Sequence, residues 1–175
     1  MGDNGRLYPA FDTHYVRKNA DLCAVADIAD PNITEAAFLT GLPYRESYPE
    51  TYIREMLLAL ADLGTKTPVL TGVSLSEGKT GAMGYDSEKK SFFSYQNDRV
   101  PVSYHGTGDI FSSVLAGAYV LGLDRTDALQ IAADYTALTI RETEKNPENP
   151  WYGVDFETTI PALLCMLKRK NKLPD

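Results

Sequence analysis

The sequence has few residues of the kinds that bind structural metals or cross-link a chain. Its 175 residues include only two cysteines, Cys23 and Cys165, and two histidines, His14 and His105. These residues lie far apart and lack the spacing of zinc ligands, and two cysteines do not make a disulfide scaffold. No apolar run reaches the roughly 18–20 residues of a membrane span, and the N-terminus lacks a signal-peptide core. We therefore expect a cytoplasmic protein without a membrane partner.

Positive charge is also scarce. Lysine and arginine number 17 and aspartate and glutamate 24, which gives a formal net charge of -7. This balance argues against broad electrostatic attraction to nucleic acid or to an anionic membrane. A polyphosphate ligand would have to be attracted locally, by backbone N–H groups, a helix N-terminus and a bound cation.

Apolar residues make up 43% of the chain, enough for one compact domain or part of one over residues 1–175. Apolar runs predict strands at 22–28, 68–73 and 100–104, and alternation around a polar turn predicts a hairpin at 82–95. Between and after them, helical spacing and end signals predict helices at 32–41 and 49–64, and others that follow Gly108, Asp124 and Pro161. Strands alternating with helices indicate an α/β fold with a mostly parallel sheet, in which ligands bind at the carboxyl ends of the strands.

The segment Gly106-Thr107-Gly108-Asp109 joins a predicted strand to a strongly apolar helix. Glycines let the backbone approach an anion closely, and free N–H groups at the start of a helix point at it. A carboxylate beside such a site suggests a base that takes the proton from an attacking hydroxyl group. The alternative is structural, with Thr107 as the N-cap and Asp109 in the first turn. These four residues alone leave both interpretations open.

Three further segments are less specific by themselves. Asn32-Ile33-Thr34-Glu35 is close to a capping box, although Glu35 also suits a hydrated Mg²⁺, which is usually held by one or two carboxylates and substrate phosphates. The segment from Met1 to Tyr8 would normally be frayed as a chain end. Thr71-Gly72 ends another predicted strand.

Together these four segments resemble the ribokinase-like superfamily, and within it the vitamin B6 kinases. Those enzymes carry Asp-Pro-Val-Met-Gly-Asp, Thr-Pro-Asn-x-x-Glu, a Thr-Gly or Thr-Ser strand end, and Gly-Thr-Gly-Asp before a helix. Here Met1-Gly2-Asp3, Pro31-Asn32-x-x-Glu35, Thr71-Gly72 and Gly106-Thr107-Gly108-Asp109 occur in that order. The resemblance spans nearly the whole chain. It implies a three-layer α/β/α fold of the ribokinase type with a mostly parallel sheet, incomplete at the N-terminus.

The resemblance also implies an activity, the ATP-dependent phosphorylation of the 5′-hydroxymethyl group of pyridoxal, pyridoxamine or pyridoxine. Asp109 would be the base that acts on this hydroxyl, and Gly106, Thr107 and Gly108 would form the anion hole. Asp3, Asn32 and Glu35 would surround the Mg²⁺–triphosphate, with Asp3 and Glu35 on the metal side. The residues implied to border the nucleotide are Thr71, Gly72, Val100, Val102 and Tyr104. Tyr8 matches a family tyrosine near the pyridine ring, and family members are commonly homodimers.

Two departures from the family pattern stand out. Asp30 replaces the usual threonine where some members bind a monovalent cation, and the sequence begins inside the first motif, so that roughly the first third of a family kinase has no counterpart. A related alternative is a hydroxymethylpyrimidine kinase, but those enzymes typically have cysteine where Asp109 stands. Another alternative is a nucleotide-binding fragment without catalytic activity.

Overall fold

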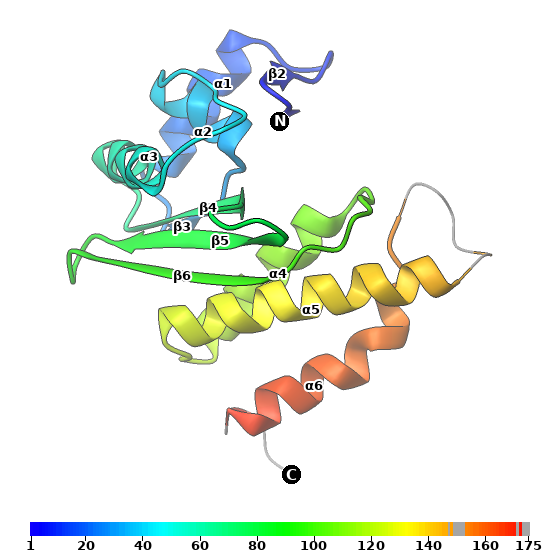
Figure 1. The fold of residues 1–175 in the computed structure, drawn as a ribbon. Coiled ribbons are helices and arrows are strands. Elements are labelled where there is room, and N and C mark those ends of the chain that lie inside the picture. The colour runs from blue at the N-terminus through cyan, green and yellow to red at the C-terminus, as the bar shows by residue number, and fades with distance from the viewer. Residues whose placement is uncertain (147, 149–152, 171, 173–175) are drawn as a thin grey trace. The chain divides into compact units, whose positions relative to one another are not determined.

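The computed structural model describes residues 1–146, 148, 153–170 and 172. Two compact units make up the chain, Met1–Ser94 and Tyr95–Asp175. Helices and strands alternate along the first unit, while helices predominate in the second (Figure 1). The α/β class predicted from the sequence is therefore confirmed. Within the described ranges, no helix is long and apolar enough to cross a membrane.

A mixed sheet with the strand order β3-β4-β5-β6 organises the first unit (Figure 1). β3 (Ile28–Ala29) pairs in parallel with β4 (Thr67–Val73), which pairs in antiparallel fashion with β5 (Lys79–Asp86). β6 (Ser91–Asp98) follows β5 and continues into the second unit. Asp86 orders the turn between β5 and β6, because its Oδ1 accepts the N–H groups of Glu88 and Lys89, each at 3.0 Å. The predicted hairpin is confirmed, with strands that extend beyond the predicted ones.

Three helices lie on one side of this sheet, α1 (Thr13–Cys23), α2 (Ile33–Thr40) and α3 (Glu50–Asp62) (Figure 1). α2 and α3 pack on β4, and α1 packs on α2. The apolar residues of α3 recur at helical spacing, so one face of the helix is buried against the sheet. The core residues are Ile33, Ala36, Ala37, Tyr52, Ile53, Met56, Leu57, Leu60, Leu70, Val73 and Met83.

Two strand predictions are wrong. The strand predicted at 22–28 is reduced to Ile28–Ala29. The residues up to Cys23 belong to α1, which begins after Asp12, and Val25 is 82% exposed. The Asp12 side chain accepts the N–H of Tyr15 at 2.9 Å and thereby caps α1. The apolar run starts in the last turn of this helix, which is why its pattern predicts a strand. Residues 99–104 form no strand. Pro101 lies within them and has no N–H to donate to a ladder.

The second unit contains α4 (Thr107–Val120), α5 (Arg125–Lys145) and α6 (Ile160–Arg169), with the short 3₁₀ helix η1 (Glu157–Thr159) before α6. α5 packs against both α4 and α6. Asp124 caps α5 by accepting the N–H of Asp127 at 2.9 Å, and Pro161 lies in the first turn of α6, as predicted. Gly122 follows α4 with φ 76°, a left-handed conformation that suits glycine at a helix end.

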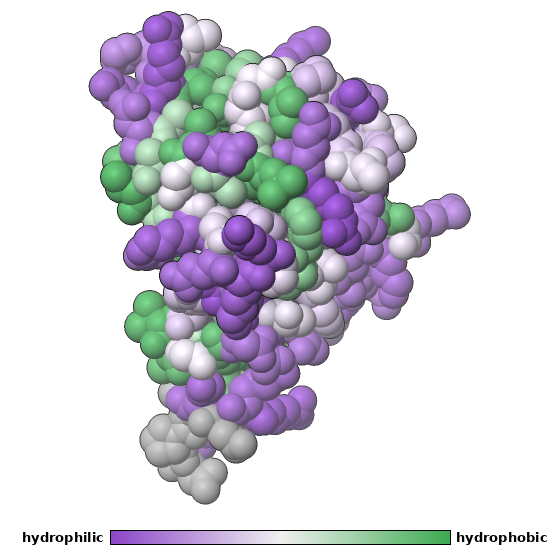
Figure 2. All heavy atoms as spheres, turned by 90° about the vertical axis from the view of Figure 1, so that its left-hand side faces the viewer, coloured by the Kyte–Doolittle hydropathy of each residue, from purple (hydrophilic) through white to green (hydrophobic). Residues whose placement is uncertain are grey.

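The surface of the protein mixes residue types, and on the face that Figure 2 shows, hydrophobic residues lie between hydrophilic ones. Scattered exposed apolar side chains of this kind are common in folded proteins. Both cysteines are free, with Cys165 exposed and Cys23 half-buried. Burial raises the pKa of the Cys23 thiol, which disfavours its reactive thiolate form.

Two glycines that follow helices allow a matched test of backbone geometry. Gly64 has φ 119°, and a Cβ atom there would lie 2.6 Å from the carbonyl oxygen of Ala24. Gly41 has φ 76°, but no described atom lies within 4 Å of the corresponding position. We expect Gly41→Ala to lower the free energy of unfolding by about 1 kcal/mol through backbone strain alone. Gly64→Ala should lower it by about 3 kcal/mol, because a steric clash adds to the strain. Urea denaturation of the two variants measures the difference, and equal losses would contradict this account.

Candidate functional site

In the first unit, several predicted site residues gather where β3 and β4 end. The chain leaves β3 through Pro31, whose carbonyl oxygen accepts the N–H of Thr71 at 3.1 Å. Asn32 and Thr71 form a parallel bridge one residue further on. Gly72 follows in an exposed position with φ 71°. Thr71 and Gly72 therefore lie beside the start of α2, at the carboxyl ends of a parallel strand pair, where ligands bind in α/β folds.

Asn32 and Glu35 form a complete capping box at the start of α2. Asn32 Oδ1 accepts the N–H of Glu35 at 2.9 Å, and Glu35 Oε2 accepts the N–H of Asn32 at 3.0 Å. The other carboxylate oxygen, Oε1, lies 2.6 Å from the ammonium group of Met1. The structural interpretation of this segment is confirmed. The Glu35 side chain is only half-buried, so a structural role and contact with a ligand are compatible.

A small hairpin attaches Asp3 to the start of α2. β1 (Gly2–Asp3) pairs in antiparallel fashion with β2 (Arg6–Leu7), and the turn between them has positive φ at Asn4 and Gly5. The Asn32 side-chain amide donates to the carbonyl oxygen of Gly2 at 2.9 Å, and the N–H of Gly5 donates to Thr34 Oγ1 at 3.0 Å. The expectation of a frayed segment is wrong, because these two bonds hold the hairpin on α2.

Tyr8 lies in the electrostatic field of the same carboxylates. Its side chain is 48% exposed, and its N–H donates to the carbonyl oxygen of Met1 at 3.1 Å. Partial burial raises the pKa of the phenol above its ordinary value, and the negative charges of Asp3 and Glu35 raise it further. Asp3, Glu35 and Tyr8 thus interact electrostatically, although Glu35 comes from a different segment than the other two.

The two carboxylates suit a hydrated Mg²⁺ better than a fully coordinated metal. Asp3 is exposed and accepts bonds from the backbone N–H and side-chain amide of Asn4, at 2.9 and 3.2 Å, which leaves further lone pairs on both oxygens. In the described part of the chain, no group of three or more His, Cys, Asp and Glu side chains could hold a metal ion. Mg²⁺ typically keeps several waters and uses only one or two carboxylates, and Asp3 and Glu35 fit that requirement.

The second unit carries the Gly-Thr-Gly-Asp segment at the start of α4. Gly106 is the N-cap, with φ 87° and ψ -6°, and no described side chain caps the helix. The expectation that Thr107 caps α4 is wrong, because Thr107 is already the first residue of the helix. Its hydroxyl donates to the carbonyl oxygen of Tyr104 at 3.2 Å. Glycine has no side chain that could cap the first N–H groups of α4, and such a helix start is the arrangement that binds anions. Asp109 lies exposed in the first turn of the helix.

The remaining predicted residues lie in the irregular segment before α4. Val100, Val102 and Tyr104 are half-buried, and His105 is exposed. The carbonyl oxygen of Tyr104 accepts the hydroxyl of Thr107, so this segment is attached to the first turn of α4. We assign no chemistry to His105.

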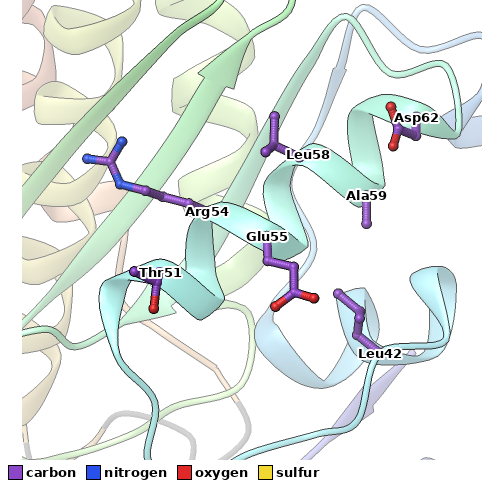
Figure 3. A pocket seen from close by; sticks show the side chains of 7 residues that line it. All are labelled: Leu42, Thr51, Arg54, Glu55, Leu58, Ala59 and Asp62. Carbon is purple, nitrogen blue, oxygen red and sulfur yellow. The ribbon is translucent and has the colours of Figure 1, made fainter.

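A surface groove on α3 in the first unit contains none of the predicted site residues (Figure 3). Of its charged side chains, Arg54 is engaged by Glu50 at 2.6 Å and stacks over the ring of Phe92. Glu55 and Asp62 would repel a phosphate. The groove is therefore unsuited to a nucleotide. Its lining residues are Leu42, Thr51, Arg54, Glu55, Leu58, Ala59 and Asp62.

Comparison with known proteins identifies several similar kinases. A family model described as phosphomethylpyrimidine kinase matches residues 9–150. A candidate pyridoxal kinase of Schizosaccharomyces pombe is 29% identical over 147 residues, which are 82% of this chain and 42% of that protein.

Two solved structures resemble this fold closely. A candidate phosphomethylpyrimidine kinase of Bacteroides thetaiotaomicron, in a crystal form with pyridoxal, is 30% identical with a TM-score of 0.85 over 93% of this chain and 58% of that one. A pyridoxal kinase of Lactobacillus plantarum is 30% identical with a TM-score of 0.82. The match covers 97% of this chain and 59% of that one. The chain spans less than half of the Schizosaccharomyces protein and somewhat more than half of each solved structure.

The cluster of carboxylates around Tyr8 can be tested by titration. Because the charge of Asp3 raises the pKa of the Tyr8 phenol, Asp3→Asn should shift that pKa down towards the ordinary value for tyrosine. Asp21→Asn is the control, since Asp21 is an exposed aspartate of α1 that does not contribute to the shift. NMR of the Tyr8 ring as a function of pH measures both. An Asp3→Asn variant that titrates at the original pH would show that Asp3 does not act on Tyr8.

Proposed function

The chain belongs to the phosphomethylpyrimidine kinase family, and from this premise we propose that it is the nucleotide-binding and catalytic part of an ATP-dependent kinase. The proposed acceptor is the 5′-hydroxymethyl group of pyridoxal or a related B6 vitamer. The observation that carries the proposal is the start of α4, where a Gly-Thr-Gly-Asp segment has no side-chain cap among the described residues. Backbone N–H groups in that position attract a phosphate locally in a protein of net charge -7.

In the proposed reaction, Asp109 takes the proton of the acceptor hydroxyl as its oxygen attacks the γ-phosphorus of ATP. The new P–O bond forms while the bond from the γ-phosphorus to the oxygen that bridges it to the β-phosphorus breaks. ADP leaves with that electron pair, and the proton stays on the Asp109 carboxyl until solvent removes it. The N–H groups of Gly106, Thr107 and Gly108 donate to the oxygens of the transferring group, whose negative charge they stabilise.

Residues of the first unit are assigned to the nucleotide and its metal ion. Asn32, Thr71 and Gly72 lie together at the ends of β3 and β4, which supports a role in binding the triphosphate. Asp3 and Glu35 would hold the water molecules of Mg²⁺. When bound, this ion neutralises charge on the phosphates. Val100, Val102 and Tyr104 are proposed to border the nucleotide.

Two observations favour a B6 vitamer as the acceptor. The similar Bacteroides thetaiotaomicron structure contains pyridoxal, and the similar Lactobacillus plantarum structure is of a pyridoxal kinase. Asp109 also stands where hydroxymethylpyrimidine kinases typically have cysteine. Tyr8 is proposed to lie near the pyridine ring, and a second copy of the chain is the proposed protein partner.

The second candidate is a hydroxymethylpyrimidine kinase, favoured by the description of the matching family. Phosphorylation by the full-length protein distinguishes the two, with pyridoxal, pyridoxamine, pyridoxine and hydroxymethylpyrimidine offered at equal concentrations. We expect kcat/KM to be at least about tenfold higher for a B6 vitamer, the factor that about 1.4 kcal/mol of differential transition-state binding supplies. A preference for hydroxymethylpyrimidine would establish the second candidate, and transfer to none of the four would contradict the proposal.

The assignment of Asp109 as the base is tested by Asp109→Asn in the full-length protein. The amide cannot accept the proton, so kcat should fall by about 10²–10⁴-fold. The affinity for ATP, measured by calorimetry, should change little, because Asp109 is not assigned to nucleotide binding. Asp62→Asn removes another exposed aspartate, at the end of α3, and should leave both values unchanged. Normal turnover by Asp109→Asn would show that Asp109 is not the base.

A further inference from the structure

A row of buried hydroxyl groups runs along one face of α5. Tyr135, Thr139 and Thr143 follow one another at intervals of four residues, so they share a side of the helix. Their exposed fractions are 2%, 1% and 1%. Buried hydroxyl groups need hydrogen-bond partners, because an unpaired polar group away from water is unfavourable. The positions of these partners show which other segment of the chain the hydroxyl groups bind.

The partners lie in segment 154–159, which leads from the irregular chain into η1. The Tyr135 hydroxyl donates to the carbonyl oxygen of Phe156 at 3.1 Å. Thr159 Oγ1 lies 3.0 Å from the Tyr135 hydroxyl and 3.2 Å from Thr139 Oγ1. Thr143 Oγ1 accepts the N–H of Asp155 at 2.9 Å. Segment 154–159 is thus attached to α5 at three successive turns of the helix.

These bonds are additional to those within the helix. Thr143 Oγ1 donates to the carbonyl oxygen of Thr139 at 2.8 Å, which already satisfies its proton. Thr136 makes the same bond to the carbonyl oxygen of Ala132, also at 2.8 Å. Within the described part of the chain, however, Thr136 has no hydrogen bond to segment 154–159. The acceptor role of Thr143 is therefore what distinguishes it from an ordinary helix threonine.

Segment 154–159 places Val154 near the start of α4. A methyl carbon of Val154 lies 4.0 Å from the position that a Cβ atom on Gly106 would occupy, at ordinary van der Waals distance. Gly106 has left-handed dihedral angles and begins the helix without a side-chain cap from the described residues. Because glycine has no side chain, the φ and ψ angles of Gly106 are not restricted locally. A neighbour that limits its motion would fix the direction of the N–H groups that follow.

We propose that Thr143 and Val154 are positioning residues for the anion hole, because the hydroxyl row of α5 holds Val154 against Gly106 and so fixes the first turn of α4. Only the effect of these residues on the reaction rests on the proposed function. Their effect on the geometry of the first turn of α4 does not depend on it. Donors that are held in place before the reaction stabilise developing charge more effectively than donors that must be ordered during it.

The amide of Ile110 reports directly on this region, since its N–H donates to the carbonyl oxygen of Gly106 at 3.0 Å. Thr143→Val preserves the shape of the side chain but removes the acceptor for Asp155. We expect hydrogen exchange at Ile110 to become about fivefold faster, the factor that corresponds to the loss of one hydrogen bond. Val154→Ala should have the same effect, and Val154→Ile should restore slow exchange.

Two controls separate this local effect from general destabilisation. Thr136→Val loses the matching bond within α5 and should change exchange at Ile110 by less than about twofold, because its partner is outside segment 154–159. The amide of Leu123, which donates to Ala118 at 3.1 Å after the other end of α4, is the internal reference. Equal acceleration at Ile110 and Leu123, or equal effects of Thr143→Val and Thr136→Val, would overturn the positioning role.

The role in the reaction is tested by kinetics in the full-length protein. We expect Thr143→Val and Val154→Ala to lower kcat by about tenfold, with the KM for the acceptor alcohol changed by less than about twofold, because the donors act on the transition state. A normal kcat together with faster exchange at Ile110 would overturn that role. Absence of turnover in the unsubstituted protein would contradict the proposed function instead, and the exchange comparison would still decide the geometry.

Discussion

One asparagine side chain joins the parts of the first unit that carry its site residues. Asn32 caps α2 through its amide oxygen and holds the β1 hairpin through its amide nitrogen, while its backbone forms a bridge with Thr71. An amide supplies one acceptor oxygen and two N–H donors from one rigid group. The positions of Asp3 and Glu35 relative to each other therefore depend on the orientation of this side chain, while the backbone of the same residue adds Thr71.

The second unit differs from the first, because its helix α4 begins without a side-chain cap among the described residues. A serine or aspartate at the N-cap would satisfy a first-turn N–H group and compete with an anion for it. Glycine leaves those groups available and adopts the left-handed geometry without strain, but it contributes no rigidity of its own. Rigidity has to come from residues that are distant in the sequence, and Val154 and the hydroxyl row of α5 are placed to supply it.

Local signals predicted much of this fold correctly, and non-local packing explains the failures. The helix starts at Asn32 and Asp124 could be predicted because a cap is a property of a few adjacent residues. The run at 22–28 misled because a short apolar stretch fits a strand or the end of a helix equally well. The dipeptide Asn4-Gly5 is a recognised turn signal that would have predicted the hairpin at β1 and β2.

The candidate site was predicted less completely than the fold. The four motifs predict its residues, of which Asp3, Asn32, Glu35 and Thr71 lie in the first unit, and their roles stay predictions. The contribution of Thr34, whose hydroxyl holds Gly5, had no sequence signal, because threonine inside a helix is ordinarily unremarkable. The placement of Val154 near Gly106 could not be predicted either, since it arises from the packing of segments that are far apart in the chain.

The capping box has a thermodynamic consequence for any ligand of Glu35. If a ligand displaces the N–H of Asn32 from Oε2, its apparent affinity is reduced by the free energy that this bond gives to the start of α2. By reciprocity, strengthening the helix start would weaken that ligand by the same factor. A ligand that approaches through water, or through Oε1, escapes this coupling to the Asn32 bond. The helix cap thereby favours a ligand that leaves the Asn32 bond in place, as a hydrated ion does.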